Sequence, residues 1–455
     1  MRYLFLILYL AILISLGIFH AFRRKSEKDF YVAGKNTGVL GVSGSLIATI
    51  LGSSAILGTV NLSWEQGWAS SWILLSAVLG LAALIPLSSF VRRFGRFTLP
   101  QMLGDFYGKR AYLISSIIIP IAWIGIIAAQ VIGAAKILGS FFDIDYTMGV
   151  ILCGVVFVFY TIAGGQLSII KTDVIQAMFV IVGVLITFIF CFYALETPVW
   201  EMKVPSFPFN EHFDLLDLLV LIITYSTTYF VGPDVYSRLF CAKNEKVARK
   251  SVIITALVMI PFAFILSFLG VFALLKYPHL EIHNVSALVH LVLNVLPEWA
   301  IGLMIAALLS AIMSSADTTL LTASAIVSGL FYSDMNHVKS VRITRLLILV
   351  FGILAIGFAL KISSIISALL LATTVFSGAF IIPTAAGLLG YRCSSMQSSS
   401  SMIVGGVIAL TGKIIALNGS VDLGNTLIIV AFILNAMILF FPFRKKVIVN
   451  DGKAS

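Results

Sequence analysis

Long apolar runs, separated by short polar or basic stretches, account for most of this 455-residue chain. A helix needs about 20 consecutive apolar residues to cross the hydrocarbon core of a bilayer. Windows of that length predict thirteen membrane-spanning helices, at residues 3–21, 38–62, 69–90, 111–139, 145–164, 172–195, 214–233, 251–275, 300–328, 343–361, 364–390, 401–417 and 424–443. The pattern therefore predicts an all-α integral membrane protein with almost no sequence left for a soluble domain.

Composition supports this class, because 60% of the residues are hydrophobic and only 11% are charged. The first span does not resemble a secretory signal, since the basic residues at 23–25 follow its apolar run instead of preceding it. The four cysteines have no metal-ligand spacing, so neither a disulfide framework nor a zinc or other transition-metal site is indicated.

The basic residues predict the orientation. If the N-terminus is outside, the cytoplasmic segments hold 24 of the 30 Lys and Arg residues, in agreement with the positive-inside rule. This assignment predicts a cytoplasmic C-terminus in the cell (plasma) membrane and places Arg238, Cys241 and Cys393 in cytoplasmic loops. It also accounts for the net charge of +10 without a nucleic-acid partner.

Spans 2–6 and 7–11 form two consecutive sets of five, which must cross the membrane in opposite senses, as an inverted repeat requires. The first span of each set carries a helix-breaking stretch, around Gly52 in span 2 and at Gly232-Pro233 in span 7. The predicted organisation is an extra helix at 1–28, a first repeat at 29–213, a second repeat at 214–395, and two C-terminal helices with a short tail at 396–455.

Span 9 carries hydroxyls and one carboxylate near its middle, where polar groups are costly unless they line a cavity or bind an ion. Ala311, Ser314, Ser315 and Thr318 share one face of the helix, at offsets of 0, 3, 4 and 7 residues. Together with carbonyls freed by the break in span 2, they could bind a hard cation such as sodium. The alternative is that these hydroxyls bond to their own helix or join neighbouring helices.

Five groups of residues resemble the sodium:solute symporter family, whose members share a thirteen- or fourteen-helix architecture with a five-plus-five inverted repeat of the leucine-transporter type. The resemblance covers roughly residues 29–395. It rests on residues 29–34 (DFYVAG), 160–165 (YTIAGG) with 172–176 (TDVIQ), 238–243 (RLFCAK) through 249, 310–320 (SAIMSSADTTL) and 377–388 (SGAFIIPTAAGL), in the order and spacing of the family.

The resemblance implies a main sodium site between spans 2 and 9. Its ligands would be the carbonyls of Ala48, Leu51 and Ala311 and the hydroxyls of Ser314 and Ser315. Some members bind a second ion nearby, and the matching positions here are Asp173, Ser314, Asp317 and Thr318. Because Asp317 stands where some relatives carry serine, it could tighten that site or carry a proton, which leaves the ion stoichiometry open.

Departures from the family pattern concern the solute. Proline-transporting members carry an aspartate where this chain has Ile50, and sugar-transporting members carry a glutamine where it has Ala55. A buried sugar hydroxyl without a partner costs about 1–3 kcal/mol, so a polyol is disfavoured. Small amino acids, monocarboxylates and similar organic solutes remain. The expected pocket residues are Ser53, Ser54, Tyr225, Ser226, Thr228 and Tyr229, unless their polar groups only satisfy backbone atoms of the broken helices.

The sequence thus predicts a secondary active transporter, and not an enzyme, that couples inward sodium flow to solute uptake. Sodium is the expected coupling ion, and no cofactor or obligate protein partner is evident. The alternatives are a channel, a sensory protein of the same fold, or an intramembrane aspartyl protease using Asp173 and Asp317. A sensory role is less favoured because only about a dozen residues follow the last span in this sequence.

Overall fold

The computed structural model describes Ser15 and residues 27–52, 54–94, 97–195, 204–279, 286–332, 337–362 and 364–441. Apart from Ser15, the predicted first span at 3–21 lies outside these residues, as does Ser53.

The described residues form helices and no strand, apart from isolated bridges between Thr37 and Ala242 and between Asn210 and Phe213. The α-helices are α2 (Glu27–Val32), α3 (Val39–Ile50), α4 (Thr59–Gln66), α5 (Trp72–Phe94), α6 (Leu99–Tyr107), α7 (Lys109–Phe142), α8 (Tyr146–Tyr193), α9 (Leu215–Leu221), α10 (Thr227–Phe230), α11 (Pro233–Cys241), α12 (Glu245–Lys276), α13 (Ala287–Val295), α14 (Glu298–Phe331), α15 (Val338–Lys361), α16 (Ile365–Leu388), α17 (Ser395–Leu417) and α18 (Val421–Phe440). Short 3₁₀ segments occupy Ala33–Lys35 and Gly67–Ser71, and π-helical segments occupy Ser54–Gly58 and Ile222–Ser226.

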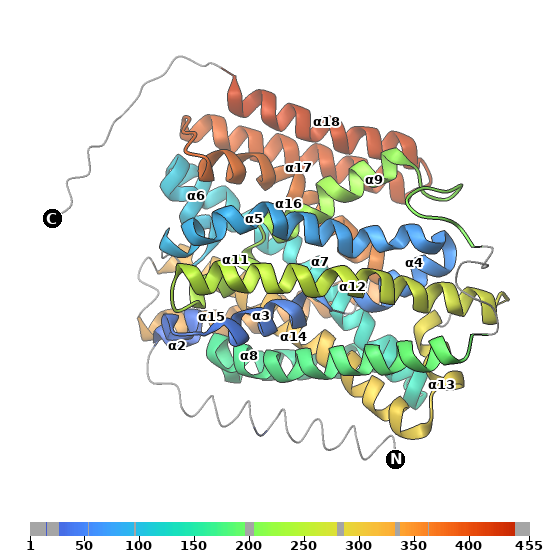
Figure 1. Ribbon diagram of the computed structural model, residues 1–455. Helices are drawn as coiled ribbons and strands as arrows, with labels where there is room; N and C mark the ends of the chain where they lie inside the picture. The colour runs from blue at the N-terminus through green and yellow to red at the C-terminus, as the bar shows by residue number, and fades with distance from the viewer. Residues whose placement is uncertain are drawn as a thin grey trace.

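Ten helical segments of the described chain are long and apolar enough to cross a membrane, and Val39–Ile50 forms a shorter apolar helix. The prediction of an all-α membrane protein is therefore confirmed, while the count of thirteen spans stays a prediction. The helix α14 is central, since 89% of its most apolar stretch is buried, against 33% for α15. The C-terminal helices α17 and α18 pack beside α16 at one edge of the bundle (Figure 1).

The helix α8 contains two predicted spans joined by a sharp reversal. Gly165 has φ +68° and ψ −178°, a conformation available essentially to glycine alone. Before this residue α8 packs antiparallel to α15, whereas after it α8 packs antiparallel to α14. Because α14 and α15 are consecutive and packed together, the two halves of α8 run in opposite directions. The spans predicted at 145–164 and 172–195 left a loop at 165–171, and this prediction is wrong. The second half of α8 is helical immediately after Gly165.

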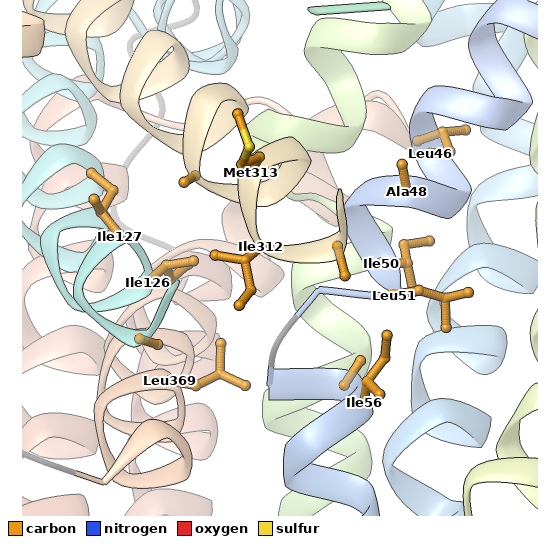
Figure 2. Packing of buried hydrophobic residues seen from close by; sticks show 14 of the residues in the cluster. Leu46, Ala48, Ile50, Leu51, Ile56, Ile126, Ile127, Ile312, Met313 and Leu369 are labelled. Atoms are coloured by element: carbon orange, nitrogen blue, oxygen red, sulfur yellow. The ribbon is translucent and has the colours of Figure 1, made fainter. Parts of the chain in front are cut away.

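The predicted break in span 2 is confirmed. The helix α3 ends at Ile50, Leu51 has the non-helical angles φ −80° and ψ 44°, and helical structure resumes at Ser54. Figure 2 shows Leu51 at the end of α3 and Ile56 beyond the interruption.

The predicted break in span 7 is also confirmed, but the predicted end of that span at residue 233 is wrong. The helix stops at Phe230, Gly232 is extended, and Pro233 opens a new helix, α11, that continues to Cys241. Proline suits a first turn because its missing N–H would have no helical partner there. As a result Arg238 and Cys241, expected in a cytoplasmic loop, are fully buried inside the bundle. The predicted cytoplasmic segments still hold most of the Lys and Arg residues when Arg238 is left out of the count.

The two broken helices run in opposite senses. The segments α3 and α4 are parallel to α12, since Val39 lies by Ser251 and Val60 by Gly270. The helix α5 is antiparallel to α12, and the segment α9–α11 is parallel to α5. This is the relation that an inverted repeat requires. The boundaries 29–213 and 214–395 remain predictions.

Candidate functional site

The middle of α14 lies directly against the break after α3. Ser315 Oγ donates a hydrogen bond to Thr49 O at 2.9 Å. A Cβ atom added to Gly52 would lie 2.4 Å from Ser315 Oγ, so only glycine allows this approach without a shift. The five residues expected to bind sodium, Ala48, Leu51, Ala311, Ser314 and Ser315, are all buried.

The end of α3 frees carbonyl oxygens, because the last four residues of a helix have no intrahelical donor. Two of these carbonyls have partners: Ile47 O accepts from Leu51 N, and Thr49 O accepts from Ser315. Ser314 Oγ is buried and makes no hydrogen bond within the described residues. The region therefore combines buried carbonyls at the end of α3 with the buried hydroxyl of Ser314.

Two of the residues proposed for a second ion, Asp173 and Thr318, contact Arg238, which sequence reasoning had treated as a loop residue. Arg238 Nη2 lies 3.3 Å from Asp173 Oδ2 and donates to Thr318 Oγ1. Both side chains of the ion pair are essentially inaccessible to solvent. The structure thus brings Asp173 and Thr318 together through a guanidinium group. Asp173 lies two helical turns beyond Gly165, so it does not open its helix as the span assignment had suggested.

Asp317, the third residue proposed for this ion, faces a different neighbour. Its Oδ1 atom accepts a hydrogen bond from Thr161 Oγ1 at 2.9 Å, across the interface between α14 and the first half of α8. No hydrogen bond joins Asp317 to Asp173 among the described residues. A shared-proton pair of the kind an aspartyl protease uses is therefore not formed. The described residues also contain no cluster of three His, Cys, Asp or Glu side chains suited to a metal.

A cavity of about 50 Å³ lies beside this polar centre. It is lined by Leu46, Thr49, Ile50, Ile126, Gln130, Tyr225, Thr228, Tyr229, Asp234, Val235, Arg238, Ser315, Thr319, Leu369 and Thr373. In Figure 2, Ile126 and Leu369 lie near Ile312, on the apolar side of this region.

Three of the six expected solute-pocket residues line the small cavity. Tyr229 OH donates to Tyr225 OH at 3.2 Å, and Thr228 Oγ1 is buried without a hydrogen bond among the described residues. Ser226 does not line it, and its hydroxyl donates a hydrogen bond to Ile222 O of the preceding turn. Ser53 lies outside the described residues, and only the backbone of Ser54 is described.

Sequence reasoning missed several residues of the site besides Arg238. Asp234, in the first turn of α11, accepts from Trp123 Nε1 at 3.0 Å and 2.9 Å through its two carboxylate oxygens. Gln130 of α7 also lines the cavity. The Gly-Pro breaker was the available signal for Asp234 and Arg238, since a proline after a break can open a new helix as well as end one.

A much larger cavity, of about 620 Å³, adjoins the small one and shares Tyr225 and Leu369 with it. It lies at the end of the bundle formed by Glu65, His212 and the start of α18, opposite the end that carries most basic residues. At the basic end, Tyr31 OH bonds to Ser340 Oγ at 2.8 Å and to Thr344 Oγ1 at 2.7 Å. The large cavity therefore lies at one end of the bundle, and hydrogen bonds between α2 and α15 join the helices at the other end.

Several known proteins are similar to this chain in sequence and in fold. The sequence model of the sodium:solute symporter family matches residues 30–405. The sodium/pantothenate symporter of Escherichia coli is 24% identical over 431 residues, which cover 89% of this chain and 88% of that protein. The sodium/sialic acid symporter of Aliivibrio fischeri is 24% identical over 384 residues, or 78% of this chain and 75% of that protein.

Among solved structures, the substrate-bound outward-open state of a Na⁺-coupled sialic acid symporter has the same fold, with a TM-score of 0.79. The two sequences are 20% identical, and the match covers 97% of this chain and 96% of that chain.

Proposed function

Because the chain belongs to the sodium:solute symporter family, we propose that it couples inward sodium flow to the uptake of one small organic solute by alternating access. Family membership makes the protein a multi-pass membrane transporter and not an enzyme. The identity of the solute, the ion site and the orientation in the membrane are parts of this proposal.

The proposed sodium ligands are the carbonyls of Ala48, Leu51 and Ala311 and the hydroxyls of Ser314 and Ser315. The observation that carries this assignment is the contact between Ser315 and the last turn of α3, next to the buried, unbonded hydroxyl of Ser314. Sodium is a hard cation, so hydroxyl and carbonyl oxygens are suitable ligands.

Sodium bound here would hold the end of α3 against α14. The same turn of α3 forms part of the small cavity through Thr49 and Ile50. Ion binding would therefore order one wall of the solute site. By thermodynamic linkage, sodium and solute then raise each other's affinity by the same factor.

We further propose that the solute is a small organic acid, with pantothenate as the first candidate. Two of the curated relatives are symporters of pantothenate and of sialic acid, and both of these compounds carry a carboxylate. The tyrosine pair could cover the carbon skeleton, and Thr228 offers an unbonded hydroxyl for a polar group. The larger cavity would then be the route by which the solute enters.

A thermal-shift screen of the purified protein tests this proposal. Pantothenate, sialic acid, proline and glucose would each be added in sodium chloride and in potassium chloride. A ligand that binds only the folded protein adds RT ln(1 + [L]/Kd) to the free energy of unfolding and so raises the melting temperature. We expect an organic acid to stabilise the protein in sodium and not in potassium. Equal stabilisation in both salts would contradict sodium coupling, and stabilisation by proline or glucose alone would contradict the proposed solute class.

A further inference from the structure

We propose that the outer face of the bundle between α7 and α17 is a binding site for an anionic phospholipid. One acyl chain of the lipid occupies an apolar groove between these helices, and its phosphate group lies against Lys109 and Arg110. The site is separate from the proposed sodium and solute sites, and its test needs neither of those ligands.

The groove has a volume of about 370 Å³ and is lined by aliphatic side chains and one glycine, Gly406. Its walls come from α7 and α17, with Val375 contributed by α16. Ile117, Ile121 and Val407 are each more than half exposed, so the groove opens to the outside of the bundle. Lipid tails are as apolar as these side chains, which makes an acyl chain a suitable occupant.

The position of the groove along the helices matches one leaflet of a bilayer. Its residues run from Ile114 to Ile121 on α7 and from Ile403 to Leu410 on α17. At about 1.5 Å per residue, the stretch on α7 extends from about 6 Å to about 16 Å beyond Arg110. One leaflet supplies about 15 Å of the hydrocarbon core. A chain whose headgroup lies at the start of α7 therefore reaches the length of the groove.

Arg110 is placed to meet that headgroup. It lies in the first turn of α7, is exposed, and follows the exposed Lys109. Ile114, Ile117 and Ile121 follow it at offsets of 4, 7 and 11 residues, which puts Arg110 and the groove on the same face of the helix.

The starts of α7 and α17 lie together at this end of the groove. A Cβ atom added to Gly108 would lie 3.6 Å from Ser395 Cβ. Arg392, shortly before α17, has its Cζ atom 4.5 Å from the centroid of the Phe106 ring, shortly before α7. A third positive charge therefore lies close to the two basic residues of α7.

Nearby acidic residues do not cancel this charge. Asp105 is the single acidic residue within residues 99–116, and residues 392–402 contain none. Three basic residues thus stand against one acidic residue at the end of the groove. Basic pockets between membrane helices attract anionic headgroups, whereas a zwitterionic headgroup has no net charge to match.

The helix α16 separates the groove from the two cavities described above. Val375 lines the groove, whereas Thr373 lines the small cavity and Thr374 lines the large one. A lipid chain in the groove would therefore contact a helix that also forms a wall of both cavities.

The experiment is a thermal-shift titration of the delipidated, purified protein with phosphatidylglycerol or with phosphatidylcholine of the same acyl chains. We expect phosphatidylglycerol to bind more tightly. Arg110→Gln should weaken its apparent affinity about fivefold, which is about 1 kcal/mol at about 1.4 kcal/mol per tenfold. The control is Arg249→Gln, which removes an exposed basic residue from α12 and should leave the affinity unchanged.

Val407→Phe tests the groove itself. The larger side chain should fill part of the groove and weaken the binding of both lipids. The matched control is Val350→Phe, at an exposed position on α15 that does not line the groove, and it should have no effect. Phospholipid that copurifies with the protein, counted by mass spectrometry, should fall in Val407→Phe and not in its control.

Equal affinities of the wild type for the two lipids would overturn the proposal, and so would equal losses in a test variant and its control. A wild-type dimer that Val407→Phe converts to a monomer, as measured by light scattering, would also overturn it, because the groove would then be a contact between copies of the chain. The comparison of the two lipids on the wild type decides the matter even if a variant does not fold.

Discussion

Adjacent serines on α14 differ in their surroundings, and this difference decides how each should respond to substitution. Ser315 bonds to Thr49 O, across the helix interface, whereas Ser314 has no hydrogen bond within the described part of the chain. Ser310, one turn earlier, is equally buried but donates to Ala306 O of its own helix at 2.7 Å. Three buried serines on one helix thus provide two test positions and a control.

Replacing either Ser314 or Ser315 by alanine should raise the sodium concentration that half-activates transport by about tenfold, which corresponds to about 1.4 kcal/mol for one lost ligand. Sodium-dependent uptake in cells or vesicles measures this directly. Ser310→Ala should leave sodium activation unchanged, because its hydroxyl is satisfied within α14. Wild-type activation in both test variants would exclude the proposed sodium site.

Asp317→Asn should have little effect on sodium cooperativity. The Oδ1 atom of asparagine can accept the same hydrogen bond from Thr161, so the contact between α14 and α8 would be kept. The Hill coefficient for sodium and the melting temperature of the purified variant are the quantities to compare. A clear fall in the Hill coefficient would instead make Asp317 a ligand of a coupled ion, the other possibility left open by the sequence.

At this scale, the sequence predicted a role for Ser314 and Ser315 because hydroxyls are conspicuous in an apolar span, and that role stays a prediction. It did not identify Arg238, which follows a Gly-Pro breaker and precedes a basic stretch that resembles a cytoplasmic loop. Only the three-dimensional arrangement brings Arg238 between α3, α8 and α14.

At the scale of helices, glycine and proline marked both breaks, and the structure confirms their positions. Sequence reasoning was less successful where a break is followed by more helix. It ended span 7 at Pro233 and inserted a loop after Gly165, because hydropathy alone cannot distinguish a helix end from a sharp turn between two helices. The conformation of Gly165 makes that turn possible.

Gly165→Ala should lower the stability of the protein by about 1–3 kcal/mol or more, since its backbone angles are unfavourable for any residue with a Cβ. The added Cβ would also lie 2.5 Å from the ring of Phe30. The apparent melting temperature in detergent measures the effect. The control is Gly357→Ala, on the exposed side of α15, where an added Cβ meets nothing within 4 Å. That variant should be neutral or slightly stabilised, and an equal melting temperature for the two variants would contradict the assigned turn.

At the scale of the whole molecule, hydropathy predicted a helical membrane bundle, and both the structure and the family match support it. It could not predict which helix faces meet, because nearly all faces are apolar. The position of the 620 Å³ cavity, the hydrogen bonds of Tyr31 at the opposite end and the central position of α14 arise only from packing.

The orientation can be tested with the native cysteines. Cys241 is buried and should not react in the folded protein, whereas Cys393 is only partly buried, between α16 and α17. Burial raises the pKa of the Cys393 thiol to about 11. Because the thiolate is the reactive form, labelling should be slow at pH 7 and accelerate about tenfold per pH unit up to that pKa.

An impermeant maleimide should label Cys393 only when it has access to the cytoplasmic side. Cys393→Ser should abolish the signal, which controls for reaction at Cys153, Cys191 and Cys241. Labelling of Cys393 from outside intact cells would reverse the predicted orientation.

The most direct test of sodium-coupled uptake is transport of labelled pantothenate into liposomes containing the purified protein. An inward sodium gradient should drive accumulation above the external concentration, and an ionophore that collapses the gradient should release the accumulated solute. A potassium gradient of the same size should give no accumulation. Equal uptake in sodium and potassium, or uptake that stops at equilibrium despite a maintained sodium gradient, would contradict a sodium symporter for this solute.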